Sequence, residues 1–193
     1  MKLTAYYGLR RNEMLGLTWD CIDFENKTLS IHQVVTESWI DKKMVLKLEQ
    51  RAKTKSSIRM YPLTEHMEEL FKQVKKQKEE YMKLFGKDYD HTNDQFVFTR
   101  PNGTMYVPSN LSHAFKNFLK KNGLKEIRFH DLRHSCASLM FEAGVSLKEI
   151  QAWLGHANLN ITANIYTHLR EAQKKESAQK LDQLFPDCTS SDI

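Results

Sequence analysis

The segment from Arg128 to Leu169 constrains the fold most, because predicted helix starts and stops alternate in it and polar side chains lie beside each break. Gly144 predicts the end of one helix, since glycine takes the left-handed position after a helix without steric cost. The run from Ser146 to Glu149 reads as a capping box that opens the next helix. The pair Gly155-His156 predicts the end of that helix. Polar groups beside such breaks can converge, so we expect a functional site here.

The first predicted helix of this segment carries two candidate site residues, His130 and Arg133. They are three positions apart and would share one face of a helix. A second face has the spacing of a buried stripe, with Leu132, Cys136, Leu139 and Met140.

The end of the segment carries the other two candidates, His156 and Tyr166. Tyr166 lies on a short stretch whose apolar face is predicted from Ile161, Ile165 and Leu169. A lone tyrosine in such a stretch usually packs in a core, so the pattern alone leaves its role open.

The formal net charge of the 193-residue chain is +5, and the segment from Asp41 to Arg59 alone carries a net charge of +5. Charge concentrated in this way is typical of a protein that binds phosphates. The charge run by itself favours a solvated hairpin, whose turn we predict at residues 53–57. Basic residues of the segment that are candidates for DNA contact are Arg51, Lys55 and Arg59.

The remaining pattern predicts an α+β fold that is mainly α, with helices around a small three-stranded antiparallel sheet. Alternating β-branched residues predict strands over 28–35, 39–48 and 58–63. Helices are expected over residues 3–17 with a break at Gly8, over 64–85 and over 108–123. Leu84 and Phe118 are among the predicted core positions of the last two helices.

Three widely spaced cysteines and the absence of a long apolar stretch indicate a cytoplasmic protein with reduced thiols and no membrane segment. No CxxC pattern is present that would indicate a zinc site.

The scattered polar residues fit the transfer of a phosphodiester without a metal ion. Guanidinium groups can hold the non-bridging oxygens, imidazoles can move protons, a lysine can protonate the leaving oxygen, and a tyrosine can attack. Arg11 competes with Arg10 for the first guanidinium, and Lys55 competes with Lys53 for the lysine. The candidate set is Arg10, Lys53, His130, Arg133, His156 and Tyr166.

Four motifs in this order resemble the catalytic domain of the tyrosine recombinase (phage integrase) family. They are YYGLRRNEMLGLTWDCIDF at 6–24, AKTKSSIRMYPL at 52–63, FHDLRHSCASLMFEAGVSLKEIQAWLGH at 129–156 and ITANIYTH at 161–168. The His-x-x-Arg box, the Leu-Gly-His box and the tyrosine ten residues after His156 are specific as a set. The resemblance covers nearly the whole chain.

The resemblance implies a role for each matching residue. The two arginines, Arg10 and Arg133, would clamp the phosphate, with Glu13 supporting them from behind. Lys53 would be the general acid. The remaining roles would be proton transfer by His130, a hydrogen bond to the phosphate from His156, and nucleophilic attack by Tyr166 to give a 3′-phosphotyrosyl link.

The resemblance also implies DNA attachment sites as partners, a homotetramer on DNA joined through the C-terminal helix, and no metal, ATP or other cofactor. It implies a bacterial or phage-encoded enzyme. We expect a catalytic domain over residues 1–185, truncated at its N-terminus, a flexible tail over 186–193, and no N-terminal core-binding domain.

Three other interpretations stay open from the residues alone. Residues 136–156 also look like a helix-turn-helix of a DNA-binding protein, or of a degenerate recombinase without catalysis. His130 and His134 have the i,i+4 spacing of some zinc helices, although Asp131 stands where that motif has Glu. A type IB topoisomerase would share the tyrosine chemistry.

Overall fold

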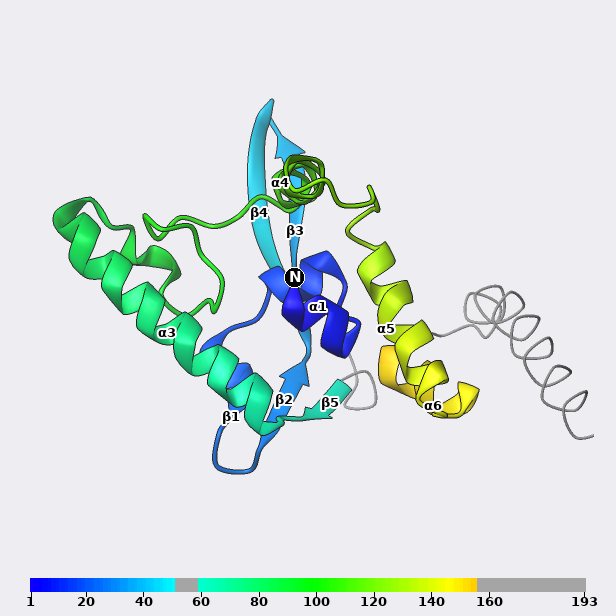
Figure 1. The fold of residues 1–193 in the computed structure, drawn as a ribbon. Coiled ribbons are helices and arrows are strands. Elements are labelled where there is room, and N and C mark those ends of the chain that lie inside the picture. Colours follow the sequence, from blue (N-terminus) through cyan, green and yellow to red (C-terminus); the bar gives the residue numbers. More distant parts are fainter. Residues whose placement is uncertain (51–58, 156–193) are drawn as a thin grey trace, which may run out of the picture. The chain divides into compact units, whose positions relative to one another are not determined.

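The structure is a computed structural model that describes residues 1–50 and 59–155 (Figure 1). The chain divides into one unit from Met1 to Cys136 and a second from Ala137 to Ile193, and each is described by itself. The elements are α1 (Lys2–Tyr7), α2 (Arg11–Leu15), η1 (Trp19–Cys21), β1 (Ile22–Asp23), β2 (Thr28–Ile31), β3 (Gln33–Ile40), β4 (Lys43–Gln50), β5 (Arg59–Pro62), α3 (Glu65–Phe85), η3 (Gly86–Asp88), η4 (His91–Asn93), α4 (Pro108–Lys121), α5 (Asp131–Glu142) and α6 (Leu147–Leu154).

The two short N-terminal helices confirm the predicted break at Gly8. This glycine has φ of 64°, and its amide donates to the carbonyl of Thr4 as the left-handed cap of α1. α2 begins three residues later at Arg11. The turn therefore places Arg10 between the two helices, at the N-cap of α2.

A three-stranded antiparallel sheet is present, but its strands differ from the predicted ones. Its order is β1-β2-β5, with Leu29 opposite Tyr61 in the β2–β5 pair. The predicted strand over 28–35 is interrupted at His32, where β2 ends and β3 begins. β2 and β5 hold Leu29 and Tyr61 in the core.

The predicted strand over 39–48 is wrong, because a hairpin turn lies inside it. Asp41 and Lys42 have φ of 49° and 61°, as in the two-residue turns that match the twist of a hairpin. β3 and β4 form a separate two-stranded sheet with Ile40 opposite Lys43, and Figure 1 shows this pair as a long hairpin. The turn that we predicted at 53–57 lies outside the described residues.

The base of this hairpin packs closely on α2. A Cβ atom on Gly16 would lie 2.9 Å from the Cα of Val34 and 3.0 Å from the carbonyl oxygen of Gln33. The side-chain amide of Gln33 donates from Nε2 to the carbonyl oxygen of Gly16 at 2.9 Å. Only glycine permits this approach of backbone to backbone, which fixes the position of α2.

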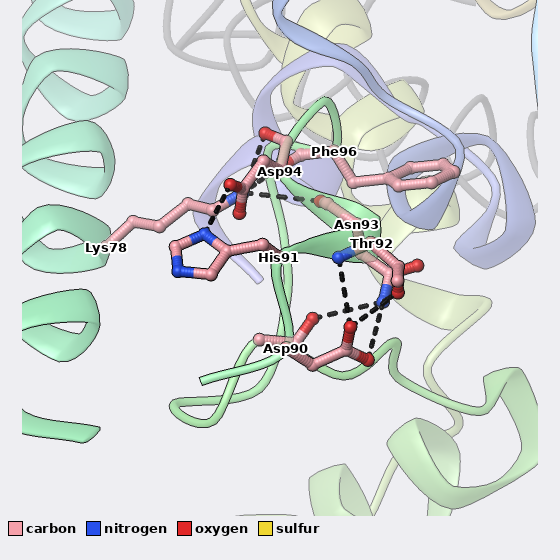
Figure 2. A network of polar contacts seen from close by, with 8 residues as sticks. Lys78, Asp90, His91, Thr92, Asn93, Asp94 and Phe96 are labelled. Carbon is pink, nitrogen blue, oxygen red and sulfur yellow. Dashed lines mark hydrogen bonds and ion pairs between the residues drawn. The ribbon is translucent and has the colours of Figure 1, made fainter. Parts of the chain in front are cut away.

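α3 confirms the predicted helix over 64–85 but buries a lysine that the apolar pattern missed. Lys78 is 7% exposed, and its Nζ donates to the carbonyl oxygens of Asn93 (3.4 Å), Asp94 (2.9 Å) and Phe96 (2.8 Å). Figure 2 shows the side chain extending from the helix into this loop. Burial lowers the pKa of Lys78, and the nearby Asp94 partly opposes the shift.

Three predicted core positions are wrong. Leu84, Phe118 and Leu139 are 76%, 47% and 61% exposed. Helical periodicity identifies the apolar face of a helix but not how far a packing partner extends along it. The described core is centred on α1, α2, the β1-β2-β5 sheet and the first half of α3, with Leu3, Tyr7, Leu9, Leu29, Tyr61, Met67 and Phe71.

In the second unit the described residues confirm the predicted capping box. Ser146 Oγ accepts from the amide of Glu149 at 3.4 Å, and a Glu149 carboxylate oxygen accepts from the amide of Ser146 at 3.0 Å. α6 ends at Gly155, whose φ is 65°. Within the part of the chain that is described, no helix is both long enough and apolar enough to cross a lipid bilayer.

Candidate functional site

A buried carboxylate, that of Glu13 on α2, is the centre of the candidate site. Its side chain is fully buried, and its Oε2 accepts from the backbone amide of Arg10 at 2.8 Å. Its Oε1 accepts from Arg10 Nη1 at 2.9 Å. Because both the backbone and the guanidinium of Arg10 are bonded to one carboxylate, this arginine is fixed locally, three residues before Glu13.

The second guanidinium on Glu13 comes from β5, far away in the sequence. Arg59 Nη2 lies 2.6 Å from the same Oε1 atom, and Arg59 Nη1 donates to the hydroxyl of Tyr61 at 3.1 Å. The Arg59 side chain is 14% exposed, compared with 33% for Arg10. We predicted Arg59 as a DNA-contacting residue, and the structure places it mostly buried, on the same carboxylate oxygen as Arg10.

Burial and mutual repulsion shift the pKa values of this cluster. Burial lowers the pKa of Arg10, and the charge of Arg59 lowers it further. Burial also lowers the pKa of Arg59. It raises the pKa of Tyr61, although the charges of Arg59, Arg133 and Arg10 oppose that shift. Tyr61 is therefore a neutral hydrogen-bonding partner of Arg59, not a second anion.

Arg133 reaches the same cluster from the first turn of α5. It is 1% exposed, and its Nη1 donates to the carbonyl oxygen of Gly8. Its charge acts on both Tyr61 and His130. The left-handed turn at Gly8 therefore presents a backbone acceptor to the second predicted arginine of the clamp.

One turn further along α5, Cys136 Sγ donates to the carbonyl oxygen of Tyr6 at 3.2 Å. Burial raises the pKa of this thiol to about 11. Cys136 is therefore an un-ionised contact between α5 and α1, which helps to hold Arg133 in place.

His130 immediately precedes α5, and its side chain is partly open to solvent. Partial burial, His134, Arg133 and Arg10 all lower its pKa, in this order of size. Its ring is 5.1 Å from the ring of His134 in an edge-on arrangement. His130 is therefore a neutral imidazole at neutral pH, next to two guanidinium groups, and can accept or donate one proton.

The structure thus brings together four of the predicted residues, Arg10, Glu13, His130 and Arg133, and adds Arg59 and Tyr61. Alternate side chains of β5 point inward, which buries Tyr61 and most of Arg59. This alternation was the one signal in the sequence that could have indicated the pair. The other predicted residues, Arg51, Lys53, Lys55, His156 and Tyr166, lie outside the described residues. Within residues 1–50 and 59–155, no group of three or more His, Cys, Asp or Glu is placed to hold a metal ion.

The sequence model of the Phage integrase family matches residues 1–173. The chain belongs to this family. A "Tyrosine recombinase XerC-like" protein of Caldanaerobacter subterraneus subsp. tengcongensis is 38% identical over 183 residues, which are 92% of this chain and 47% of that protein. The ICEBs1 integrase of Bacillus subtilis is 33% identical over 181 residues, 92% of this chain and 46% of that protein. This phage integrase family chain therefore spans about half the length of the curated relatives that it matches.

Solved structures of the family share the fold. The Tn1549 transposon integrase in complex with transposon right end DNA has a TM-score of 0.71 at 23% identity, over 92% of this chain and 57% of that one. The XerH site-specific recombinase bound to palindromic difH substrate has a TM-score of 0.60 at 26% identity, over 92% of this chain and 43% of that one. The predicted fold class, mainly helical α+β with a small antiparallel sheet, is confirmed.

Proposed function

We propose that this chain is the catalytic domain of a tyrosine recombinase that cuts and rejoins duplex DNA at specific sites. The proposal rests on its membership of the phage integrase family and on the arginine cluster around Glu13. Relatives such as the Tn1549 integrase are described in complex with DNA. The substrate would be the DNA attachment sites of a mobile element.

The observation that carries the proposal is the way in which Arg10 is held. Within the described part of the chain, Glu13 is the hydrogen-bonding partner of its guanidinium, and it engages Nη1 alone. A guanidinium has five N–H donors in a planar fork that matches a phosphate. The Nε and Nη2 donors of Arg10 therefore remain available, in an orientation that is fixed before any substrate binds.

Such a preorganised donor fits a reaction in which negative charge develops on a phosphorus centre. Arg10 and Arg133 would hold the two non-bridging oxygens of the scissile phosphate. His130, kept neutral by partial burial and by the two arginines, would take the proton of the attacking hydroxyl. These roles need no metal ion and no ATP.

The covalent step would use residues outside the described ranges. The hydroxyl oxygen of Tyr166 would form a bond to phosphorus, and the bond from phosphorus to the 5′ oxygen would break. Lys53 would give its proton to that leaving oxygen, while His156 donates a hydrogen bond to the phosphate. Attack by a 5′ hydroxyl of a second duplex would then release Tyr166 and join the strands, so the energy of the original bond is retained.

Recombination joins two duplexes, so the active assembly on DNA would be a homotetramer, held together through the C-terminal helix. Arg51 and Lys55 would contact the DNA backbone from the basic segment around Lys53. Residues 1–185 would make up the catalytic domain.

Covalent trapping tests the proposal. The protein, expressed from its complete gene, is mixed with a nicked duplex of its attachment site, and a protein–DNA adduct that survives denaturation is sought. Tyr166→Phe should abolish the adduct. Tyr6→Phe is the matched control and should leave the adduct intact. Tyr6 is 40% exposed, and Thr64 is the hydrogen-bond partner of its hydroxyl among the described residues. Binding without an adduct would indicate a recombinase fold retained for DNA binding alone.

A further inference from the structure

A pocket with a volume of about 730 Å³ lies next to the arginine cluster, within the unit of residues 1–136. α2, α4 and the segment before α5 line it, with Arg11, Ser112, His113 and His130 among the lining residues. The charges of Arg133 and Arg10 also lower the pKa of His130. The pocket therefore adjoins the place where the scissile phosphate would be held, and the proposed catalytic roles leave most of it unused.

Two of the three arginine and lysine side chains in the pocket lining are neutralised by carboxylates. Lys116 pairs with Glu126 at 3.3 Å. Arg128 pairs with Asp131 at 2.9 Å. Both pairs are internal to the pocket wall, so they add little net charge to it.

Arg11 differs from these two in having only neutral partners. Its Nη1 donates to Ser112 Oγ at 2.7 Å and its Nε donates to Asn12 Oδ1 at 3.2 Å. No carboxylate lies within ion-pair distance of Arg11 among the residues that the structure describes. The guanidinium is thus tied to α4 by a hydroxyl, while its charge and its Nη2 donor remain available to an anion.

We propose that Arg11, with Ser112 orienting it, holds a second DNA phosphodiester, next on the same strand to the one that Arg10 holds. Arg10 and Arg11 are consecutive, so their Cα atoms are about 3.8 Å apart. Their side chains diverge, one to Glu13 and β5, the other to Ser112 and α4. This inference rests on the proposed function, because it presumes that DNA is the substrate.

A contact of this kind would position the strand without reading its sequence. It would fix which phosphodiester lies opposite Arg10 and therefore which bond is cut. The sequence left open which of Arg10 and Arg11 holds the scissile phosphate. In this proposal both bind phosphates: Arg10 binds the scissile one, and Arg11 binds the adjacent one.

The salt dependence of DNA binding measures the contact. For unaltered protein and Arg11→Ala, log Kobs for the attachment-site duplex is plotted against log salt concentration. Loss of one phosphate contact should reduce the slope by about 0.9. Arg100→Ala removes the same charge from an exposed position outside the pocket and should leave the slope unchanged. An equal slope for Arg11→Ala and the unaltered protein would overturn the inference.

A methylphosphonate scan of the DNA separates this contact from a merely structural bond to Ser112. Replacing one phosphate at a time removes its negative charge, and the unaltered protein should lose affinity at the phosphate next to the scissile one. Arg11→Ala should be insensitive at that position only, and Arg11→Lys should recover part of the sensitivity. No position that depends on Arg11 would contradict the proposal, even if the covalent adduct still forms. Absence of both DNA binding and adduct would instead overturn the proposed function, and this site with it.

Discussion

Two cations of the first unit, the half-buried Arg10 and the buried Lys78, are satisfied in opposite ways. All three ammonium hydrogens of Lys78 have a carbonyl acceptor, on Asn93, Asp94 and Phe96 (Figure 2). Arg10 shares one carboxylate with Arg59, and its Nε and Nη2 donors remain available to a ligand. A saturated cation stabilises a loop, whereas a cation that is fixed but not saturated can bind an anion.

Burial also affects the two cations differently. Desolvation lowers the pKa of Lys78. Its ammonium group makes three charge-assisted hydrogen bonds in return. The buried carboxylate of Glu13 pairs with Arg10 and Arg59 and sets the direction of their guanidinium groups. Glu13 is thus the residue on which the orientation of the site depends most.

The largest effect is expected from Glu13→Ala. Removing one partner from a buried ion cluster leaves uncompensated charge and costs about 3–5 kcal/mol. Urea unfolding should show this loss, and strand cleavage should fall as well because Arg10 is no longer fixed. Glu13→Gln keeps the shape and one acceptor, so it should cost less. A loss below about 1 kcal/mol for the alanine variant would show that Glu13 does not organise the cluster.

Arg10→Ala should separate catalysis from stability. Loss of one donor to the developing charge is expected to slow cleavage by about 10²–10³-fold, as measured by single-turnover formation of the covalent adduct. The unfolding free energy should change much less than for Glu13→Ala, because Arg59 still neutralises the carboxylate. Arg10→Lys should not restore the rate, because an ammonium lacks the planar fork. A normal cleavage rate in the alanine variant would break the contrast with Lys78.

Lys78→Met should show the reverse pattern. It preserves the apolar stem but leaves buried carbonyls without their charged donor, at a cost of about 2 kcal/mol. Adduct formation per folded molecule should be unchanged. Lys75→Met, at an exposed position one turn earlier on α3, is the control and should change neither quantity. Slower cleavage by folded Lys78→Met protein would mean that the loop acts on the site.

The smallest effect is expected from the titration of His130. Its pKa is lowered in the folded chain, mainly by burial and then by His134 and the arginines. The unfolded chain therefore binds the proton more readily, and the unfolding free energy should fall as the pH drops below the ordinary value of 6.5. Urea unfolding at pH values of about 5 and about 7.5 would measure this difference. His130→Asn should reduce it, and an unchanged difference would assign the titration to another group.

Local sequence signals predicted the elements whose causes lie within a few residues. The stop at Gly8, the long helix α3 and the capping box of Ser146 and Glu149 are all confirmed, because each depends on contacts between near neighbours. The hydrogen bond that the Arg10 amide donates to the Glu13 carboxylate is of the same local kind. The strand over 39–48 was wrong because non-glycine residues, Asp41 and Lys42, form the left-handed turn.

What the sequence by itself determined is the family and the fold class, because motif order and helix periodicity are properties of the chain. The tertiary structure decided which groups surround the candidate arginines Arg10 and Arg133. Arg59 joins Glu13 across 46 positions, Tyr61 becomes the neutral partner of Arg59, and Lys78 is buried among carbonyls that follow it by 15 to 18 positions. No periodicity encodes such pairings, since they arise only when distant elements pack and a buried charge must find a partner.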